Sequence, residues 1–373
     1  MEHIVLVMAA VFALFMLGHV VPASCGLRRI NRSPETKPAV GVSVVKPVKG
    51  LDADVWNNFR SFCEQDYKGP YEIIFSLQDK SDPALPLLYK LKEKYSGVDI
   101  KIIVNPVKEG LTGKSSNLLY GARMARHPYL VFSDADMYVE KDFITKIVAP
   151  LLDHKVGLVS ALPVHVDPKG LWALVYQLQL NGTVLAQWLP YAGIFKLGVA
   201  GGTIAVRRDV LDEIGGIEAF GGYVAEDVKI GQMVVEAGYE VRVGPPVISP
   251  VGAKSYEDAV SLLARGALIY RRMLHTALEI PFMVVAYFYG VAGIGYLLTG
   301  MPEYLYAFLV HLGGKMLTMF LVTRRAGTGG KEALVLPVMD AVFLWTYIRI
   351  VVQGTLSWRG ITYHVDREGR MIR

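Results

Sequence analysis

The sequence predicts an α/β domain built on a doubly wound, mostly parallel sheet, with membrane segments at both ends of the chain. Two observations lead to this fold class. Residues 39–275 alternate short runs rich in Val and Ile with amphipathic stretches, which is the pattern of parallel strands joined by helices. The apolar excess of the chain, with 52% hydrophobic residues and a mean hydropathy of +0.34, is concentrated in residues 4–23 and after residue 280.

The N-terminal apolar run, residues 4–23, contains no Lys, Arg, Asp or Glu. As a helix it is long enough to cross the roughly 30 Å hydrocarbon core of a bilayer. A cleaved signal peptide is the alternative. The basic residues Arg28, Arg29 and Arg32 follow the run, and no Lys or Arg precedes it, which favours an uncleaved anchor with the next segment in the cytosol.

The middle of the chain supplies the strands and helices of the sheet. Strands are expected at 39–46, 71–77, 98–104, 129–133 and 156–161. Stretches with the apolar spacing of helices lie between them, at 52–64, 83–95, 115–126 and 141–152. In sheets of this kind, ligands bind beyond the carboxyl ends of the strands, so the residues that follow each strand are candidates for a site.

Carboxylates follow two of the expected strands. Asp79 comes directly after the second strand, and Asp134 and Asp136 come after the fourth. A single Asp at such a position is more often a helix cap. A D-x-D pair after a buried strand differs, because its two carboxylates can hold a hard divalent cation and a ribose hydroxyl together. Oxygen ligands suit Mg²⁺ or Mn²⁺, and either ion neutralises a diphosphate.

A second acidic pair begins an amphipathic helix further along the chain. Glu226 and Asp227 start this helix, and Gly238 is expected to end it. Acids at a helix N-terminus interact favourably with the helix dipole, which is one interpretation of the pair. A base at the mouth of a site is the other. Both interpretations stay open at this point.

Several classes of protein are disfavoured by what the sequence contains. The net charge of +5 is modest and forms no dense basic stripe, which argues against nucleic acid as a partner. Two cysteines cannot form a disulfide framework or a Cys/His metal cluster. Residues 110–115 resemble a phosphate-binding P-loop only superficially, because the glycine spacing is wrong, and no G-x-S-x-G elbow occurs.

The C-terminal part contains further candidate membrane segments. Residues 280–298 and 304–322 are apolar, and basic residues flank the pair on both sides, as in a helical hairpin whose ends face the cytosol. Residues 333–356 either span the membrane or lie at its interface. Lys315 and Asp340 inside apolar segments suggest a transporter as a third hypothesis, which the small number of spans disfavours.

A set of ordered motifs covers nearly the whole chain. They are Ser43–Gly50, Leu77–Ala84, Lys114 with Asn117, Ser133–Asp136, Val156–Pro163, Gly222–Asp227 and Ser357–Gly360. In this order they resemble the family 2-like glycosyltransferases, most closely the ceramide glucosyltransferase branch (family 2/21-type). The resemblance implies a transmembrane anchor at 1–27 and a GT-A glycosyltransferase domain at 38–275. It also implies membrane or interfacial helices at 279–357 and a basic cytosolic-type tail at 358–373.

The resemblance also implies an activity. It is an inverting, metal-dependent transfer from a nucleotide sugar, a UDP-hexose or UDP-N-acetylhexosamine, to a hydroxyl of a membrane lipid. Ceramide, diacylglycerol, a hopanoid and a polyprenyl phosphate are the candidate acceptors. The protein is then an integral, multi-pass membrane protein whose catalytic domain faces the cytosol.

The residue roles follow from the motif matches. Asp79 should contact the uridine part of the donor and Asp134 its ribose or phosphate region, while Asp136, with Asp134, should bind Mn²⁺ or Mg²⁺. Asp227 should be the general base. Lys114 and Arg265 are expected to contact the donor, Arg265 at its pyrophosphate.

The sequence departs from the family in one motif. A Gln- or Arg-x-x-Arg-Trp element is expected, but Leu262–Gly266 stands in its place. Arg265 is kept, whereas Leu262 replaces the polar residue and Gly266 the tryptophan. This departure leaves a second hypothesis open, that the chain is a non-catalytic homologue acting as a scaffold or partner subunit.

Overall fold

The computed structural model describes residues 6–7, 10, 37–107, 112–184, 201–273, 287–353, 355–358, 361–366 and 368–372. The chain divides into two compact units, each assembled from segments that are distant in the sequence. The sheet unit comprises residues 28–167 and 191–252, and the helical unit comprises residues 1–27, 168–190 and 253–373.

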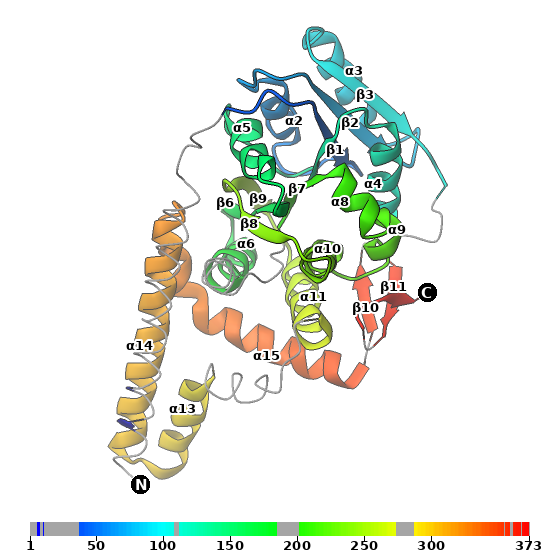
Figure 1. Cartoon of the computed structure of the whole chain (residues 1–373). Helices are drawn as coiled ribbons and strands as arrows, with labels where there is room; N and C mark the ends of the chain where they lie inside the picture. Colours follow the sequence, from blue (N-terminus) through cyan, green and yellow to red (C-terminus); the bar gives the residue numbers. More distant parts are fainter. Residues whose placement is uncertain are drawn as a thin grey trace. The chain divides into compact units, whose positions relative to one another are not determined.

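The sheet unit (Figure 1) is built on a sheet whose seven strands have the order β3-β2-β1-β4-β7-β5-β8. Its strands are β1 (Val42–Pro47), β2 (Tyr71–Leu77), β3 (Asp99–Val104), β4 (Tyr129–Ser133), β5 (Val156–Ala161), β7 (Thr203–Arg207) and β8 (Glu240–Val243). β1 pairs in parallel with β2 and β4, β2 with β3, and β5 with β8. Only β7, among the paired strands of this sheet that the structure describes, runs antiparallel to its neighbours. The prediction of a mostly parallel α/β sheet is confirmed.

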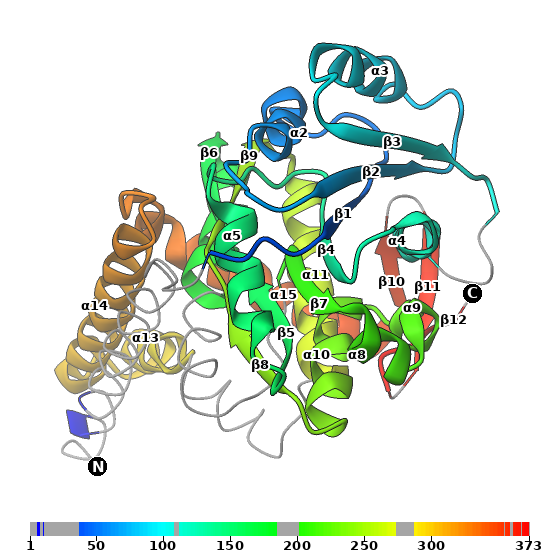
Figure 2. The ribbon, with the colours of Figure 1, turned by 45° about the horizontal axis from the view of Figure 1, so that its top comes forward.

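Helices cover both faces of this sheet (Figure 2). Their bounds are α2 (Val55–Cys63), α3 (Leu85–Lys94), α4 (Gly113–Met124), α5 (Phe143–Val148), the 3₁₀ turn η1 (Ala149–Leu152), α8 (Arg208–Glu213), α9 (Gly216–Phe220) and α10 (Glu226–Glu236). Successive side chains of a strand point to opposite faces. Val44 therefore packs in the core with α2, α3 and α5, and Val45 packs in the core with α4, α8, α9 and α10.

Most of the expected element positions agree with the structure. The second, fourth and fifth expected strands match β2, β4 and β5 at both ends, whereas the first strand begins at Val42 rather than at residue 39. The expected helix at 141–152 is instead the short α5 followed by η1. Pro150 explains this change, because proline has no N–H to continue an α-helical ladder. β6 (Pro163–Lys169) and β9 (Val247–Ala253) form a separate two-stranded sheet.

The helical unit packs its described helices around an apolar core. Its elements are α6 (Leu171–Leu178), the π-helical turn η2 (Gln179–Val184), α11 (Tyr256–Met273), α13 (Phe288–Thr299), α14 (Pro302–Arg325), η3 (Lys331–Val335), α15 (Leu336–Gln353), β10 (Thr355–Trp358), β11 (Ile361–Val365) and β12 (Met371–Ile372). Side chains from α6, α11, α14 and α15 meet in one cluster that includes Leu178, Leu263, Met319 and Leu336.

The expected membrane segments lie in this unit. Within the residues that the structure describes, α14 is the one helix long and apolar enough to cross a bilayer, and α13 is shorter. α13 and α14 are joined by Gly300 and Met301, and Gly300 has the left-handed backbone (φ 68°) that ends the first helix, as expected for a hairpin. Apart from residues 6–7 and 10, the predicted anchor at 4–23 falls outside the described residues, and so does the start of the predicted span at 280–298.

A buried ion pair links two helices of the helical unit. The Lys315 Nζ on α14 lies 2.5 Å from the Asp340 Oδ2 on α15, and the Tyr289 hydroxyl donates to the same oxygen at 2.8 Å. A charge buried in an apolar helix bundle requires such a partner. The two residues that motivated the transporter hypothesis therefore neutralise one another within this unit.

Candidate functional site

The candidate site lies in the sheet unit, where β4 ends. Ser133 is the last residue of β4, and the chain then turns through Asp134–Met137, with the Met137 N–H donating to the Asp134 carbonyl oxygen at 3.3 Å. The Asp134 N–H donates to the Gly202 carbonyl oxygen at 2.8 Å, which attaches the turn to the start of β7. Gly202, the residue just before β7, is therefore hydrogen-bonded to the D-x-D turn.

Lys114 connects the turn to the far acidic pair. The Thr112 side chain accepts a hydrogen bond from the Ser115 N–H at 3.1 Å and so caps helix α4, which carries Lys114 in its first turn. The Lys114 Nζ lies 2.6 Å from the Asp134 Oδ1 and 2.6 Å from the Glu226 Oε1. Burial lowers the pKa of Lys114, but the two carboxylates outweigh it and hold the pKa above its usual range.

Glu226 and Asp227 form the first turn of α10, where the sequence left their role open. The Asp227 Oδ1 accepts a hydrogen bond from the Val228 N–H at 2.9 Å, as an acid at a helix N-terminus does. Burial, followed by the neighbouring charge of Glu226, raises the pKa of Asp227 to about 6. A carboxylate with this pKa is more basic than an ordinary Asp and is still mostly ionised at pH 7.

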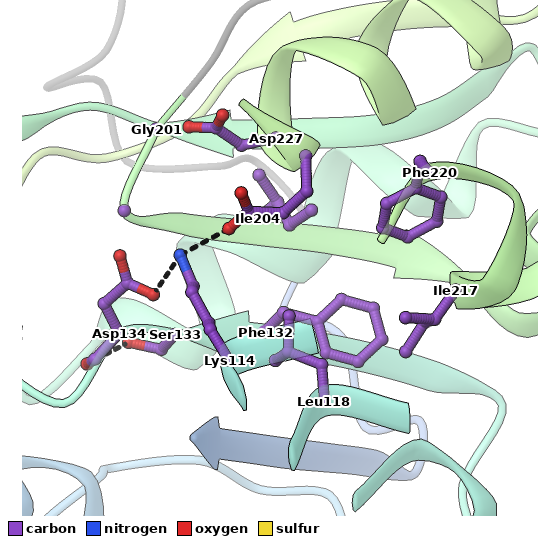
Figure 3. Close-up of a pocket in the computed structure, with 12 residues that line it drawn as sticks. Lys114, Leu118, Phe132, Ser133, Asp134, Gly201, Ile204, Ile217, Phe220 and Asp227 are labelled. Carbon is purple, nitrogen blue, oxygen red and sulfur yellow. Dashed lines mark hydrogen bonds and ion pairs between the residues drawn. The ribbon is translucent and has the colours of Figure 1, made fainter. Parts of the chain in front are cut away.

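These side chains line one pocket of about 360 Å³ (Figure 3). Lys114, Asp134, Glu226 and Asp227 supply its charged part. The apolar part is formed by Leu118, Phe132, Ile204, Ile217 and Phe220. One ammonium group therefore faces three carboxylates, and the lining carries an excess of negative charge when all of them are ionised.

Asp136 and Asp79 lie outside the described lining of this pocket. Asp136, on the same turn as Asp134, accepts a hydrogen bond from the Ser249 hydroxyl at 3.2 Å. Asp79 follows β2, which is separated from β4 by β1. It is exposed, and its Oδ1 accepts hydrogen bonds from the Ser81 N–H at 2.8 Å and the Ser81 hydroxyl at 2.7 Å. The structure therefore does not bring Asp79 together with the other carboxylates.

The donor atoms suit a hard divalent cation. Asp134 and Asp136 offer only oxygen, and Mg²⁺ is commonly held by one or two carboxylates together with substrate phosphates. Among the described residues, no group of three or more acidic, His or Cys side chains forms a complete protein cage. Burial has the largest effect on the pKa of Asp134 and raises it, Lys114 opposes this effect, and the charge of Asp136 raises the pKa further. A bound cation would relieve the repulsion between the Asp134 and Asp136 carboxylates.

Two site residues were missed at the sequence level. Glu226 was noted only as a partner of Asp227 at the helix start, and the structure shows that it shares Lys114 with Asp134. Lys46, at the end of β1, is fully buried and donates to the Asp134 carbonyl oxygen at 2.8 Å. Its burial lowers its pKa to about 7, against the raising effect of Asp136 and Asp134. A lysine inside the motif Ser43–Gly50 was the available signal.

Arg265 belongs to the helical unit, on α11, and is partly buried. On the same helix, Leu262 is buried. A Cβ added at Gly266 would find its nearest neighbour, the Gln179 Nε2, at 3.9 Å, so a side chain could begin there without a clash. The absence of the expected tryptophan at this position is therefore not forced by crowding at the Cβ.

Two curated proteins similar to this chain are named as ceramide glucosyltransferases. The chain is 28% identical over 256 residues to "Ceramide glucosyltransferase 3" of Caenorhabditis elegans, covering 67% of this chain and 55% of that protein. It is 29% identical over 232 residues to "Ceramide glucosyltransferase 1" of the same organism, covering 61% and 49%. The chain spans about half the length of these curated relatives.

Among solved structures, the fold is similar to a mannosyltransferase from Pyrobaculum calidifontis in complex with GDP-Man and Mn²⁺, with a TM-score of 0.49 and 16% identity over 93% of this chain and 99% of that one. The sequence model of the family "Glycosyl transferase family 21" matches residues 3–371, nearly the whole chain. The resemblance predicted from the motifs is confirmed, and the chain belongs to glycosyl transferase family 21.

Proposed function

We propose that this protein transfers a sugar from a nucleotide sugar, a UDP-hexose or UDP-N-acetylhexosamine, to a hydroxyl of a membrane lipid such as ceramide. The observation that carries the proposal is the pocket in which Lys114 lies between Asp134 and Glu226 with Asp227 beside them. These residues occupy the motif positions expected for donor binding and for the base. The related proteins named as ceramide glucosyltransferases support the lipid acceptor.

Asp227 is the proposed general base. It removes the proton from the acceptor hydroxyl while the hydroxyl oxygen attacks the anomeric carbon of the donor. The bond from that carbon to the diphosphate breaks, and the nucleoside diphosphate leaves with the electron pair. Attack from the face opposite the leaving group inverts the anomeric carbon. A pKa of about 6 suits this role, because the base is ionised near neutrality and binds a proton more strongly than an ordinary Asp.

The donor's diphosphate is the part that this lining would repel. Lys114 is one cation against the carboxylates of Asp134, Glu226 and Asp227, so a diphosphate needs further positive charge in order to bind. A Mn²⁺ or Mg²⁺ ion held by Asp134 and Asp136 would neutralise the leaving group. Asp79 at the uridine and Arg265 at the pyrophosphate are proposed from the motif matches alone.

The proposed acceptor and localisation rest on the helical unit. α13 exposes large apolar side chains, with Leu297 82% and Leu298 80% exposed. Exposed apolar surface of this kind is typical of a face that contacts lipid. We therefore propose an integral, multi-pass membrane protein with a GT-A sheet unit in the cytosol and an acceptor taken from the membrane.

The experiment that tests this proposal uses the purified full chain in detergent. Transfer from UDP-glucose, UDP-galactose and UDP-N-acetylglucosamine to ceramide and diacylglycerol is measured by mass spectrometry of the lipid product, with Mn²⁺, with Mg²⁺ and with a chelator. A glycolipid that forms only with the cation supports the proposal. A protein that binds neither UDP-sugar nor Mn²⁺ contradicts it.

A non-catalytic scaffold or partner subunit is the second candidate, and the observation that favours it is the altered element at Leu262–Gly266. Hydrolysis of the donor without any acceptor separates the two. An active site with an intact base and metal pair releases UDP slowly under these conditions, whereas a degenerate homologue releases none.

A further inference from the structure

Lys46 is a fully buried lysine that the reaction proposed above does not use. It lies at the carboxyl end of β1, beside Ser133 of the neighbouring strand β4, and its side chain has an exposed fraction of 0%. Burying an ammonium group inside a protein core is costly unless each of its donors is satisfied. Lysines are therefore almost never fully buried without a specific partner.

Every donor position of Lys46 has a partner. Its Nζ donates to the Asp134 carbonyl oxygen at 2.8 Å and to the Ser133 hydroxyl oxygen at 3.1 Å, and it lies 3.9 Å from the centre of the Phe62 ring. The ring face offers a favourable contact to the remaining side of the ammonium group. Two N–H groups are enough for the two oxygens, so these two hydrogen bonds do not depend on the protonation of the amine.

The acceptors of Lys46 belong to the turn that carries the two acids. The Asp134 carbonyl oxygen also accepts from the Met137 N–H at 3.3 Å, and this bond closes the turn. The Ser133 hydroxyl lies 2.9 Å from the Thr203 hydroxyl on β7. Lys46 therefore holds the peptide group between Asp134 and Ala135, within the turn that carries both acids.

The packing of the core does not require a charge at this position. Methionine has a similar length and would fill the same space against Phe62, and its apolar side chain avoids the cost of burying an ammonium group. The partners would not be left unpaired, since the Asp134 carbonyl oxygen keeps the Met137 N–H and Ser133 keeps Thr203. Stability alone therefore does not account for Lys46.

We propose that Lys46 is a positioning residue, which fixes the Asp134–Met137 turn from within the core so that the Asp134 and Asp136 carboxylates are held in the geometry that binds the cation and the donor diphosphate. This inference rests on the proposed function for its consequence in the site. The contact to the turn itself is independent of that function.

The test compares Lys46→Met with Lys101→Met in the full chain in detergent. Lys101 is a matched control because it is a lysine of the same sheet whose Nζ pairs with the buried Glu72 at 2.7 Å, far in the strand order from β4. Amide hydrogen exchange of the peptide covering residues 133–138 reports on the turn without any ligand. Binding of Mn²⁺ in the presence of UDP, followed by electron paramagnetic resonance, reports on the carboxylates.

Lys46→Met is expected to unfold at the same temperature as the parent or a higher one. Exchange in the 133–138 peptide should rise about tenfold, the effect of one lost hydrogen bond. Mn²⁺ binding with UDP should weaken about 10- to 100-fold, as when a group that orients a metal ligand is removed. Lys101→Met should show the opposite pattern, with a lower unfolding temperature, unchanged exchange at 133–138 and unchanged Mn²⁺ binding.

Unchanged amide exchange at 133–138 in Lys46→Met overturns the inference. It is also overturned if Lys46→Met loses Mn²⁺ binding only together with a fall in its unfolding temperature. If the parent itself binds no Mn²⁺ with UDP, the proposed function has failed. In that case the exchange result still decides whether Lys46 holds the turn, so the two failures are distinguishable.

Discussion

Replacing Asp227 with Asn removes the proposed base and keeps the size of the side chain. The pKa of Asp227 is raised from 3.8 to about 6, first by burial and then by the charge of Glu226. The transfer rate of the parent should therefore rise with pH through about 6, as the carboxyl group loses its proton. Removing a general base lowers turnover by about 10²- to 10⁴-fold, so Asp227→Asn should bind the donor and lose transfer.

The raised pKa of Asp227 also predicts that the stability of the fold falls as pH rises, whereas the transfer rate rises. A carboxyl group whose pKa is higher in the folded state than in the unfolded state binds its proton more tightly when folded, so stability falls as pH rises from about 4 to about 6. Above that range the full penalty is present, up to about 3 kcal/mol from the difference between 3.8 and about 6. Asn carries no charge, so Asp227→Asn should unfold at a higher temperature than the parent at pH 7.5 and at nearly the same temperature at pH 4.

The assay measures kcat and KM for the donor from pH 5 to pH 8, with thermal unfolding of the same samples. Asp212→Asn is the matched control, because Asp212 is an exposed acid on α8 of the same unit and does not line the pocket. It should leave turnover and stability unchanged. An Asp227→Asn variant that retains turnover within about tenfold of the parent, or a parent rate that falls between pH 5 and pH 7, would refute the assignment of the base.

Two further predictions concern the candidate site, and a third concerns a buried carboxylate elsewhere in the sheet. Asp136→Ala should lose Mn²⁺-dependent UDP binding, measured by calorimetry, while Ser249→Ala, which removes only the hydroxyl donor at 3.2 Å, should weaken it less. Lys114→Met leaves Asp134 and Glu226 without their shared cation, so donor binding should fall. The free energy of unfolding should drop by about 1–3 kcal/mol at pH 7. The drop should be smaller at pH 5, where the two carboxyl groups can take up protons. Glu72→Gln should cost about 2–3 kcal/mol at pH 7 in thermal unfolding without changing donor affinity.

The Glu72 prediction follows from the direction of its pKa. Burial alone would raise this pKa, but Lys101, the Ser43 hydroxyl at 2.6 Å and the Arg126 N–H at 2.7 Å outweigh burial and lower it from 4.5. The ionised group therefore stabilises the fold above about pH 4.5, and this contribution is lost as pH falls through the lower folded-state pKa. Glu72→Gln should not show this loss of stability at low pH.

The sequence was sufficient to predict the position of the D-x-D turn, because a buried strand followed by acids has few alternatives in a parallel sheet. β4 ends at Ser133 as expected, and Asp134 lines the pocket. The partnership of Lys114 with Glu226 was not predictable in the same way. It joins residues far apart in the chain, and an acid in the first turn of a helix already has a sufficient local explanation in the helix dipole.

Lys46 was missed for a different physical reason. The run Val42–Pro47 has the composition of a fully buried strand, and periodicity identifies the strand without saying what its one charged residue faces. Only the neighbouring strand supplies that information, since β4 places Ser133 and Asp134 within reach of the Nζ. Arg265 shows the opposite case. The motif suggested a role at the pyrophosphate, and the residue lies on α11 of the other unit, so that role stays a prediction.

The D-x-D turn is held by two lysines that reach it from opposite faces of the sheet. Lys46 packs against Phe62 of α2, whereas Lys114 comes from α4, and α2 and α4 belong to the two different cores. Lys114 binds the Asp134 side chain at the pocket, where an incoming diphosphate or cation competes for both partners. Lys46 binds the Asp134 backbone inside the core, where no ligand can displace it. Substitution of Lys114 should therefore change donor affinity most, and substitution of Lys46 should change the geometry of the turn before any ligand arrives.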